Sequence, residues 1–193
     1  MHGMVHKGIG VFVTNSFGAA DWDALCQELG IDVDPASATQ LNDFIATQIL
    51  FTMAERTGRP KREVMEDYGM FLMTSDITSG IRRLMRFGGA DFIEYIDSLE
   101  DLPGRIRLAI DDFILPSLTV IEETPMKYKI KVETKLGAFT FVLIGMFRAM
   151  ADDYGTLCDI SHHSRDDAGD IISIEIFDLG FDKGRDFSLV GAA

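Results

Sequence analysis

The sequence predicts an α+β domain in which a helical N-terminal lobe packs on a C-terminal four-stranded antiparallel sheet with one inserted helix. Three observations predict this. Apolar residues recur at helical spacing up to about residue 114, the pattern changes to strand-like alternation at Pro116, and a strongly apolar helical stretch separates two pairs of alternating segments. The 193 residues suit a single domain. We expect a helical lobe over about 1–114, an α/β lobe over about 115–180 and a tail over 181–193.

Stop and start residues divide the N-terminal lobe into helices. Gly30 and Gly58 each follow an apolar-periodic stretch, as glycines that end helices do, and Pro60 suits the first turn of the next helix. Pro103 removes a backbone donor, so a break or kink is expected near Leu102. The expected helices cover residues 3–17, 21–30, 39–57, 60–74, 76–87 and, as one or two helices, 90–110.

Alternating apolar residues predict two hairpins in the C-terminal lobe. The first joins strands 117–122 and 127–134 through a turn at Thr124-Pro125, and the second joins strands 156–163 and 170–177 through a polar loop. Between the hairpins, residues 137–154 form an apolar helix that ends at a glycine. Composition does not change near residue 115, so we expect the lobes to share a core, with any ligand in the cleft between them.

Charge and cysteine content exclude several classes of protein. There are 18 Lys and Arg against 31 Asp and Glu, a net charge of −13, so a surface that follows nucleic-acid phosphates is not expected. The longest charge-free apolar run, residues 136–147, is too short for a membrane-spanning helix, which needs about 20 residues. Cys26 and Cys158 lie far apart in a chain without a secretory signal, so we expect reduced thiols in a soluble cytoplasmic protein.

Motifs for catalysis are absent, and those for metal binding are sparse. The chain has neither phosphate-binding glycine loop and no GxSxG nucleophile motif, so we expect no enzyme activity. Cys158 and His162 share a strand face and are zinc-type residues, but a structural site needs four ligands, so they are weak candidates against an ordinary hairpin surface. His2 and His6 share a helical face; they either touch a cofactor or metal or are an inert, partly exposed pair.

A series of strings in order along the chain carries a family resemblance: MHGMV, FGAADWDAL, EVMEDYGMFL, FGGADFIEYIDSLEDL, LPSL and GMFRAMADDYG. From Met1 to about Asp178 the sequence resembles the haem nitric oxide/oxygen-binding (H-NOX or HNOB) family. The resemblance implies a haem between the lobes, held by a proximal histidine. It also implies that gas binding shifts the lobes and so signals to a cyclase, kinase or other effector protein.

Two haem contacts of the resembled family are missing from this sequence. The family's NLDxLH-like ligand string corresponds to Ser98–Pro103, so Pro103 stands where the iron ligand is expected, and no histidine lies between His6 and His162. The family's YxSxR string corresponds to Lys131–Lys135, which has neither the tyrosine nor the arginine. Each lost charge-assisted bond to a haem propionate is worth about 1.5–3 kcal/mol. We therefore expect no conventionally ligated haem, although the family makes haem a possible cofactor.

The resemblance also marks apolar positions that would face the haem. Two interpretations of them stay open: larger side chains fill the core in place of haem, or an apolar pocket persists, because an empty cavity of porphyrin size would be costly. The pocket positions implied by the resemblance are Val5, Ile9, Pro103, Pro116, Val142 and Met146.

These observations lead to two hypotheses of function. In the first, the chain is a sensory or regulatory module without conventional haem that acts through a signalling effector protein of the kinase or cyclase class. In the second, it binds a tetrapyrrole or another apolar small molecule in the inter-lobe cleft. An axial ligand would then be non-standard, such as His2, His6, Tyr95 or a methionine.

Overall fold

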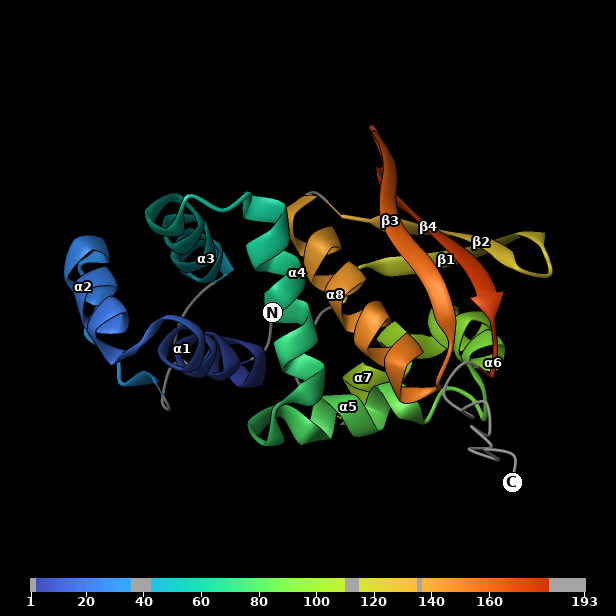
Figure 1. The fold of residues 1–193 in the computed structure, drawn as a ribbon, viewed down its shortest axis with the longest axis horizontal. Coiled ribbons are helices and arrows are strands. Elements are labelled where there is room, and N and C mark those ends of the chain that lie inside the picture. The colour runs from blue at the N-terminus through green and yellow to red at the C-terminus, as the bar shows by residue number, and fades with distance from the viewer. Residues whose placement is uncertain (1–2, 36–42, 110–114, 135–136, 181–193) are drawn as a thin grey trace, which may run out of the picture.

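The computed structural model describes residues 3–35, 43–109, 115–134 and 137–180 (Figure 1). Its N-terminal part is helical throughout. The helices and short 3-10 turns of this part, in chain order, are α1 (Gly3–Phe17), α2 (Ala19–Leu29), α3 (Asp43–Thr57), α4 (Lys61–Thr74), η2 (Asp76–Thr78), α5 (Ser79–Arg86), α6 (Phe92–Asp97), η3 (Ser98–Asp101) and α7 (Leu102–Ala109).

The C-terminal part is an antiparallel sheet with one helix between its two hairpins. It consists of β1 (Ser117–Thr124), β2 (Lys127–Glu133), α8 (Gly137–Asp153), β3 (Leu157–Asp166) and β4 (Gly169–Asp178). The strand order is β1-β2-β4-β3, so β2 and β4 join the hairpins at the centre of the sheet. Ile130 of β2 pairs with Val120 on one side and with Ile172 on the other, which aligns apolar residues across the sheet. The predicted fold class is confirmed.

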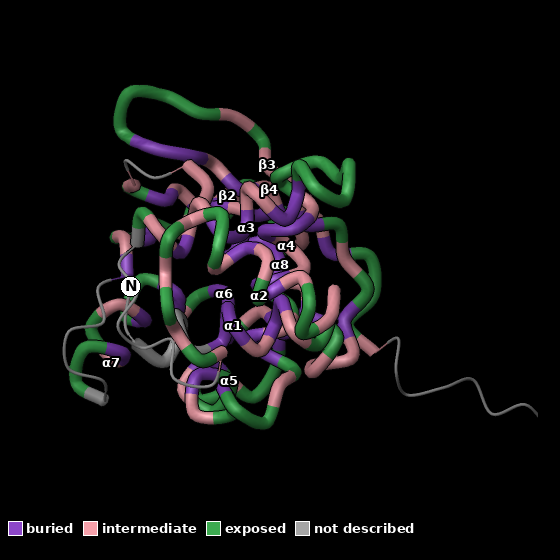
Figure 2. The backbone as a smooth tube through the Cα atoms, turned by 90° about the vertical axis from the view of Figure 1, so that its left-hand side faces the viewer, coloured by how far each residue is buried: buried purple, intermediate pink, exposed green. Residues whose placement is uncertain are grey.

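Both parts contribute to one hydrophobic core. A single cluster of buried residues includes side chains from α1 to α7, from the sheet and from α8. In Figure 2 the buried segments gather in the middle of the molecule, around α4 and α8, and exposed segments form the periphery. Helix α8 is buried on most of its surface, which explains why its sequence is apolar without a clear polar face.

Helices α4 and α8 approach each other through glycines. A Cβ atom added at Gly69 on α4 would collide with the carbonyl oxygen of Val142, and one added at Gly145 on α8 would collide with that of Glu66. The two backbones are therefore in direct contact, which any larger residue at either glycine would prevent. This contact forms the centre of the interface between the helical part and α8.

Element boundaries differ from the sequence expectations at several places. The expected helix 76–87 begins as the 3-10 turn η2, and the expected break near Leu102 is the 3-10 segment η3, which ends one residue earlier. The strands of the second hairpin extend through most of the expected polar loop and leave only residues 167–168 as the turn. The start of the expected helix 39–57 and the tail 181–193 lie outside the described residues.

Candidate functional site

The structure places the predicted pocket positions on several elements. Ile9 on α1 and both Val142 and Met146 on α8 are buried in the core. Pro116, just before β1, and Pro103, in the first turn of α7, are half-buried. Val5 lies on α1, and its side chain is outside the described residues. Val142 and Met146, one turn apart, lie together at the contact with α4.

Helix α4 has separate faces for α1 and α8. Its residues Tyr68 and Leu72 face α1: a Cβ atom added at Gly8 would lie 3.0 Å from Leu72 Cδ2 and 3.2 Å from Tyr68 Oη. Gly69 faces α8, about 100° around the helix from Tyr68. Helix α1, which carries Ile9, therefore packs on a different side of α4 from Val142 and Met146.

The segment where the family resemblance places the iron ligand offers no imidazole. Here η3 continues into α7, and Pro103, in the first helical turn, has neither a side-chain donor nor a backbone N–H. Among the described residues of α6, η3 and α7, no imidazole is present. The residues of this segment do not fit a conventionally ligated haem.

Tyr95, a candidate for a non-standard ligand, is buried on α6 among aromatic rings. Its ring stacks on Phe92 at 5.7 Å between centroids and contacts Phe147 edge-on at 6.3 Å. Its hydroxyl is buried and, within the described part of the chain, has no hydrogen-bond partner. Burial raises the pKa of this hydroxyl well above its usual value. Iron is bound by the tyrosinate form, so burial makes Tyr95 a poor ligand.

Near the end of β2, where the resemblance places a propionate clamp, the nearest guanidinium comes from β3. Val132 is buried, Glu133 is exposed, and Arg165 of β3 donates to the carbonyl oxygen of Thr134 at 3.4 Å. The same guanidinium donates to the Asp170 carboxylate at 2.7 Å. Asp170 thus already pairs with Arg165, and Glu133 adds negative charge beside it.

The weak metal candidates, Cys158 and His162, are not arranged as a metal site. His162 Nε2 lies 2.8 Å from Asp170 Oδ1, and the Thr140 hydroxyl of α8 donates to Asp170 Oδ2 at 2.9 Å. Burial, with smaller contributions from Asp152 and Asp159, raises the pKa of the Cys158 thiol to about 11. Among the described residues no group of three or more His, Cys, Asp or Glu side chains could hold a metal. Here His162 connects the second hairpin to α8 through Asp170.

The histidines near the N-terminus cannot be assigned a contact. His2 lies outside the described residues, and His6 lies on α1 with its side chain outside them. Both stay predictions as cofactor or metal contacts.

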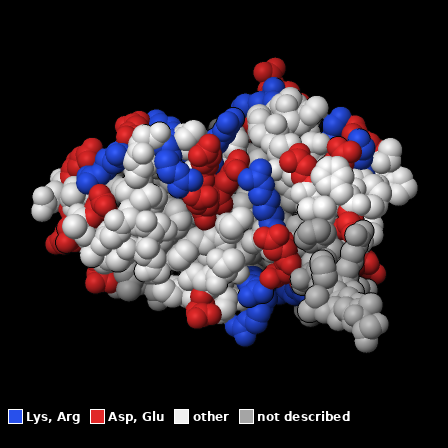
Figure 3. All heavy atoms as spheres, in the orientation of Figure 1, with Lys and Arg blue, Asp and Glu red and all other residues white. Residues whose placement is uncertain are grey.

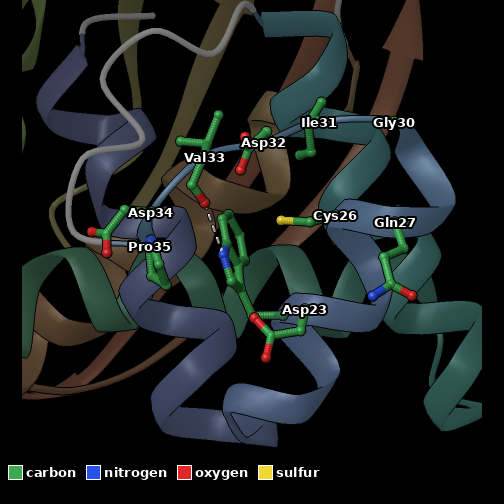
Figure 4. A pocket seen from close by; sticks show the side chains of 10 residues that line it. Asp23, Cys26, Gln27, Gly30, Ile31, Asp32, Val33, Asp34 and Pro35 are labelled. Carbon is green, nitrogen blue, oxygen red and sulfur yellow. Dashed lines mark hydrogen bonds between the residues drawn. The ribbon is translucent and has the colours of Figure 1, made fainter.

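One hollow, of about 710 Å³, lies beside α2 and the segment that follows it (Figure 4). The Trp22 indole forms part of its wall and donates through Nε1 to the Val33 carbonyl oxygen at 3.1 Å. Three carboxylates, of Asp23, Asp32 and Asp34, line it. A lining this acidic disfavours anionic ligands such as haem propionates.

A second hollow, of about 400 Å³, lies between α5 and the C-terminal end of α8. We call its lining the arginine surface; it consists of Ser79, Arg82, Arg83, Arg86 and Asp153. The sequence analysis did not single out these residues. The sequence signal that could have indicated this surface is the amphipathic pattern of α5. Ile81 and Met85 are buried on one side of the helix, and the arginines lie between them at helical spacing.

Together, the helical part, the antiparallel sheet and the inserted helix define an α+β domain built on one shared core. The family model described as Haem-NO-binding matches residues 2–162. The chain therefore belongs to the haem-NO-binding (HNOB, H-NOX) family.

Solved H-NOX structures share this fold at low sequence identity. A Shewanella oneidensis H-NOX protein in the Fe(II)NO state has a TM-score of 0.78 and 16% identity, covering 92% of this chain and 100% of that one. An unliganded Fe(II) H-NOX protein from K. algicida has a TM-score of 0.76 and 15% identity, covering 92% and 97%. Identities this low show the fold alone.

A curated relative is the soluble guanylate cyclase gcy-35 of Caenorhabditis elegans. It is 29% identical over 106 residues, which are 53% of this chain. The match spans only 15% of the length of that cyclase, so most of the larger protein lies outside it. No helix among the described residues is long and apolar enough to cross a membrane.

Proposed function

We propose that this chain is an H-NOX-type regulatory module that works without conventionally ligated haem and without catalysis of its own, through a signalling partner protein. The observation that carries the proposal is Pro103, which lies in the first turn of α7 and which the sequence resemblance aligns with the family's iron ligand. A protein whose proximal segment lacks an imidazole cannot hold haem iron as its relatives do.

Two further features support this function. The cation near the expected propionate clamp, Arg165, is already paired with the buried Asp170. The glycine contact between α4 and α8 closes the middle of the inter-lobe interface. These features favour a core filled by side chains. The family's link to a cyclase makes the partner a kinase- or cyclase-class effector, and the net charge disfavours nucleic acid.

A second candidate function is binding of a tetrapyrrole or another apolar molecule with a non-standard ligand. The observation that favours it is Met146, a buried thioether among the predicted pocket positions. A methionine needs no deprotonation to bind iron, whereas Tyr95 does. Met146 is therefore a more suitable non-standard ligand than Tyr95.

The absorption spectrum of the purified protein tests the proposal. The chain is produced in cells supplied with a haem precursor and purified without added haem. We expect no Soret band, because iron lacks its usual ligand. A Soret band at one haem per chain would overturn the haem-free function, and loss of that band in Met146→Leu would establish the second candidate.

A gain-of-ligand variant distinguishes a filled core from a persistent pocket. Pro103→His places an imidazole at the expected ligand position. Leu108→His places one at a 90% exposed position about 140° around the same helix and is the matched control. We expect neither variant to acquire a Soret band, because in the proposed function side chains fill the interface. A band in Pro103→His alone would show that an apolar pocket of porphyrin size persists.

A further inference from the structure

We propose that the arginine surface, extended by Phe87, is a docking site for an acidic segment of a partner protein. The inference rests on the proposed signalling function and names the chemistry of the partner: glutamates and aspartates around an apolar side chain. The site is built by two elements distant in sequence, α5 and the C-terminal end of α8.

Arg82 and Arg86 are held in place by the end of α8. Arg82 forms two hydrogen bonds with the Asp153 carboxylate, at 2.7 and 2.5 Å. Arg86 donates to the main-chain carbonyl oxygen of Asp153 at 2.7 Å, and its guanidinium lies 4.1 Å from the centroid of the Tyr154 ring. Both guanidinium groups are thereby ordered at the surface, which lowers the entropy that a binding partner must remove.

Arg83 and Phe87 are available to a partner. Arg83 lies on α5 and Phe87 is the C-cap of that helix, four residues on, so the two share a face. The Arg83 side chain is exposed, and among the described residues its guanidinium has no ion-pair partner. Phe87 has 85% of its surface exposed, an unusual state for an aromatic side chain. A free guanidinium fork beside an exposed ring suits a carboxylate next to an apolar side chain.

The charge balance favours a short acidic segment over a larger polyanion. Three arginines and one carboxylate line the hollow, so it is locally positive, although the whole chain carries a net charge of −13. In Figure 3 basic atoms gather at the lower edge of the molecule, over the position of α5, beside acidic atoms. An extended nucleic acid or an anionic membrane would meet the surrounding acidic surface, whereas a peptide can contact the arginine surface alone.

The position of the surface gives docking a regulatory consequence. Ser79 and the arginines belong to the helical part, and Asp153 belongs to the helix inserted in the sheet. A partner carboxylate that binds here either displaces the Asp153 carboxylate from Arg82 or binds beside it. Docking is thus sensitive to how α5 sits against α8, and a partner can detect a shift between the two.

Binding of a defined peptide tests the proposal. The probe is a short fluorescein-labelled glutamate peptide with one central phenylalanine, measured by fluorescence anisotropy with the full chain, and a lysine peptide of the same design is the control probe. We expect the glutamate peptide alone to bind, and more weakly as salt is added. Amide shifts in a 15N-labelled NMR titration are expected in α5 and at the end of α8.

Charge-reversal variants locate the site. Arg83→Glu removes the free guanidinium, and we expect roughly a tenfold or greater loss of affinity. Arg62→Glu, at the exposed N-terminal end of α4, makes the same charge change elsewhere and is expected to alter affinity by less than about twofold. Phe87→Ser tests the apolar contact and is expected to weaken binding at unchanged charge.

Several results would overturn the proposal. Equal weakening by Arg83→Glu and Arg62→Glu would show only a net-charge effect. Tighter binding of a DNA duplex or of phosphatidylserine vesicles would assign the surface to another class of partner, and self-association abolished by Arg83→Glu would assign it to a second copy. A Soret band would overturn the haem-free function alone, whereas absence of peptide binding without a Soret band would overturn the docking site alone.

Discussion

At the scale of single residues, Pro103 suits the start of a helix, and its side chain has no atom that could bind iron. Proline fixes φ at about −65°, which is a helical value, and it lacks an N–H. The first turn of a helix tolerates this loss because an N–H there has no partner within the helix. Pro103 lies in this turn of α7. The residue at the expected ligand position is therefore favourable for the helix, so under the proposed function the fold is kept without the family's usual iron ligand.

The raised pKa of Cys158 leads to a prediction about thiol reactivity. At pH 8 a thiol with a pKa of about 11 is almost wholly protonated, and only the thiolate reacts with iodoacetamide. We expect Cys158 in the folded protein to be alkylated roughly a hundredfold more slowly than an ordinary exposed thiol. Its rate should increase as the pH is raised toward 11. Mass spectrometry of the alkylated peptides over time measures this.

Cys26 and the unfolded chain are the controls for that measurement. The pKa of Cys26 is also raised, mainly by burial, but a hydrogen bond with the backbone of Val33 opposes the shift. Cys26 is expected to react faster than Cys158 in the folded protein, and both at the same rate in urea. Equal rates in the folded protein would contradict the burial of the Cys158 thiol.

At the scale of elements, the contact between α4 and α8 depends on two glycines. Glycine inside a helix costs about 1 kcal/mol relative to alanine, so its presence at both positions needs a reason. The reason is the close approach of the two backbones, which a Cβ atom at Gly69 or Gly145 would prevent. In the sequence these glycines resemble other helix-interior glycines, such as Gly104, and only the packing distinguishes them.

Two alanine substitutions with opposite expected signs test this contact. Gly145→Ala forces α8 away from the Glu66 carbonyl, and we expect a loss of unfolding free energy of about 1–3 kcal/mol or more. Gly104→Ala on α7 has nothing within 4 Å of the added Cβ atom, so it should stabilise the protein by about 0.4–1 kcal/mol. Urea denaturation measures both, and a stabilising Gly145→Ala would contradict the close approach.

At the scale of the whole molecule, the helical part and the sheet share one buried cluster. Ion pairs reinforce the connection at the surface: Arg148 of α8 forms a salt bridge with Glu66 of α4, and Arg82 of α5 with Asp153. Exposed pairs of this kind contribute little, about 0–1 kcal/mol each, so the buried apolar interface accounts for most of the connection.

A shared core predicts a single unfolding transition. Trp22 is the only tryptophan and is buried in the helical part, so its fluorescence reports on that part, whereas far-UV circular dichroism reports on helices and sheet together. We expect the two thermal transitions to coincide, as they do for a cooperative domain. A fluorescence transition that precedes the circular dichroism transition would instead indicate parts that unfold independently.

The sequence alone determined the fold class, the two hairpins, the inserted helix and the family. Each depends on local periodicity or on ordered strings, and periodicity directly reflects which side of a helix or strand is buried. The sequence also shows that no histidine lies between His6 and His162, so the expected proximal segment carries no imidazole of its own.

Only the tertiary structure decided which residues meet. The glycine contact between α4 and α8 and the arginine surface join positions far apart along the chain; Arg82 and Asp153 are separated by 71 residues. Local pattern marks each arginine as one exposed residue of an amphipathic helix. It carries no information about which distant element ends beside that helix, because the packing of the whole core sets their relative position.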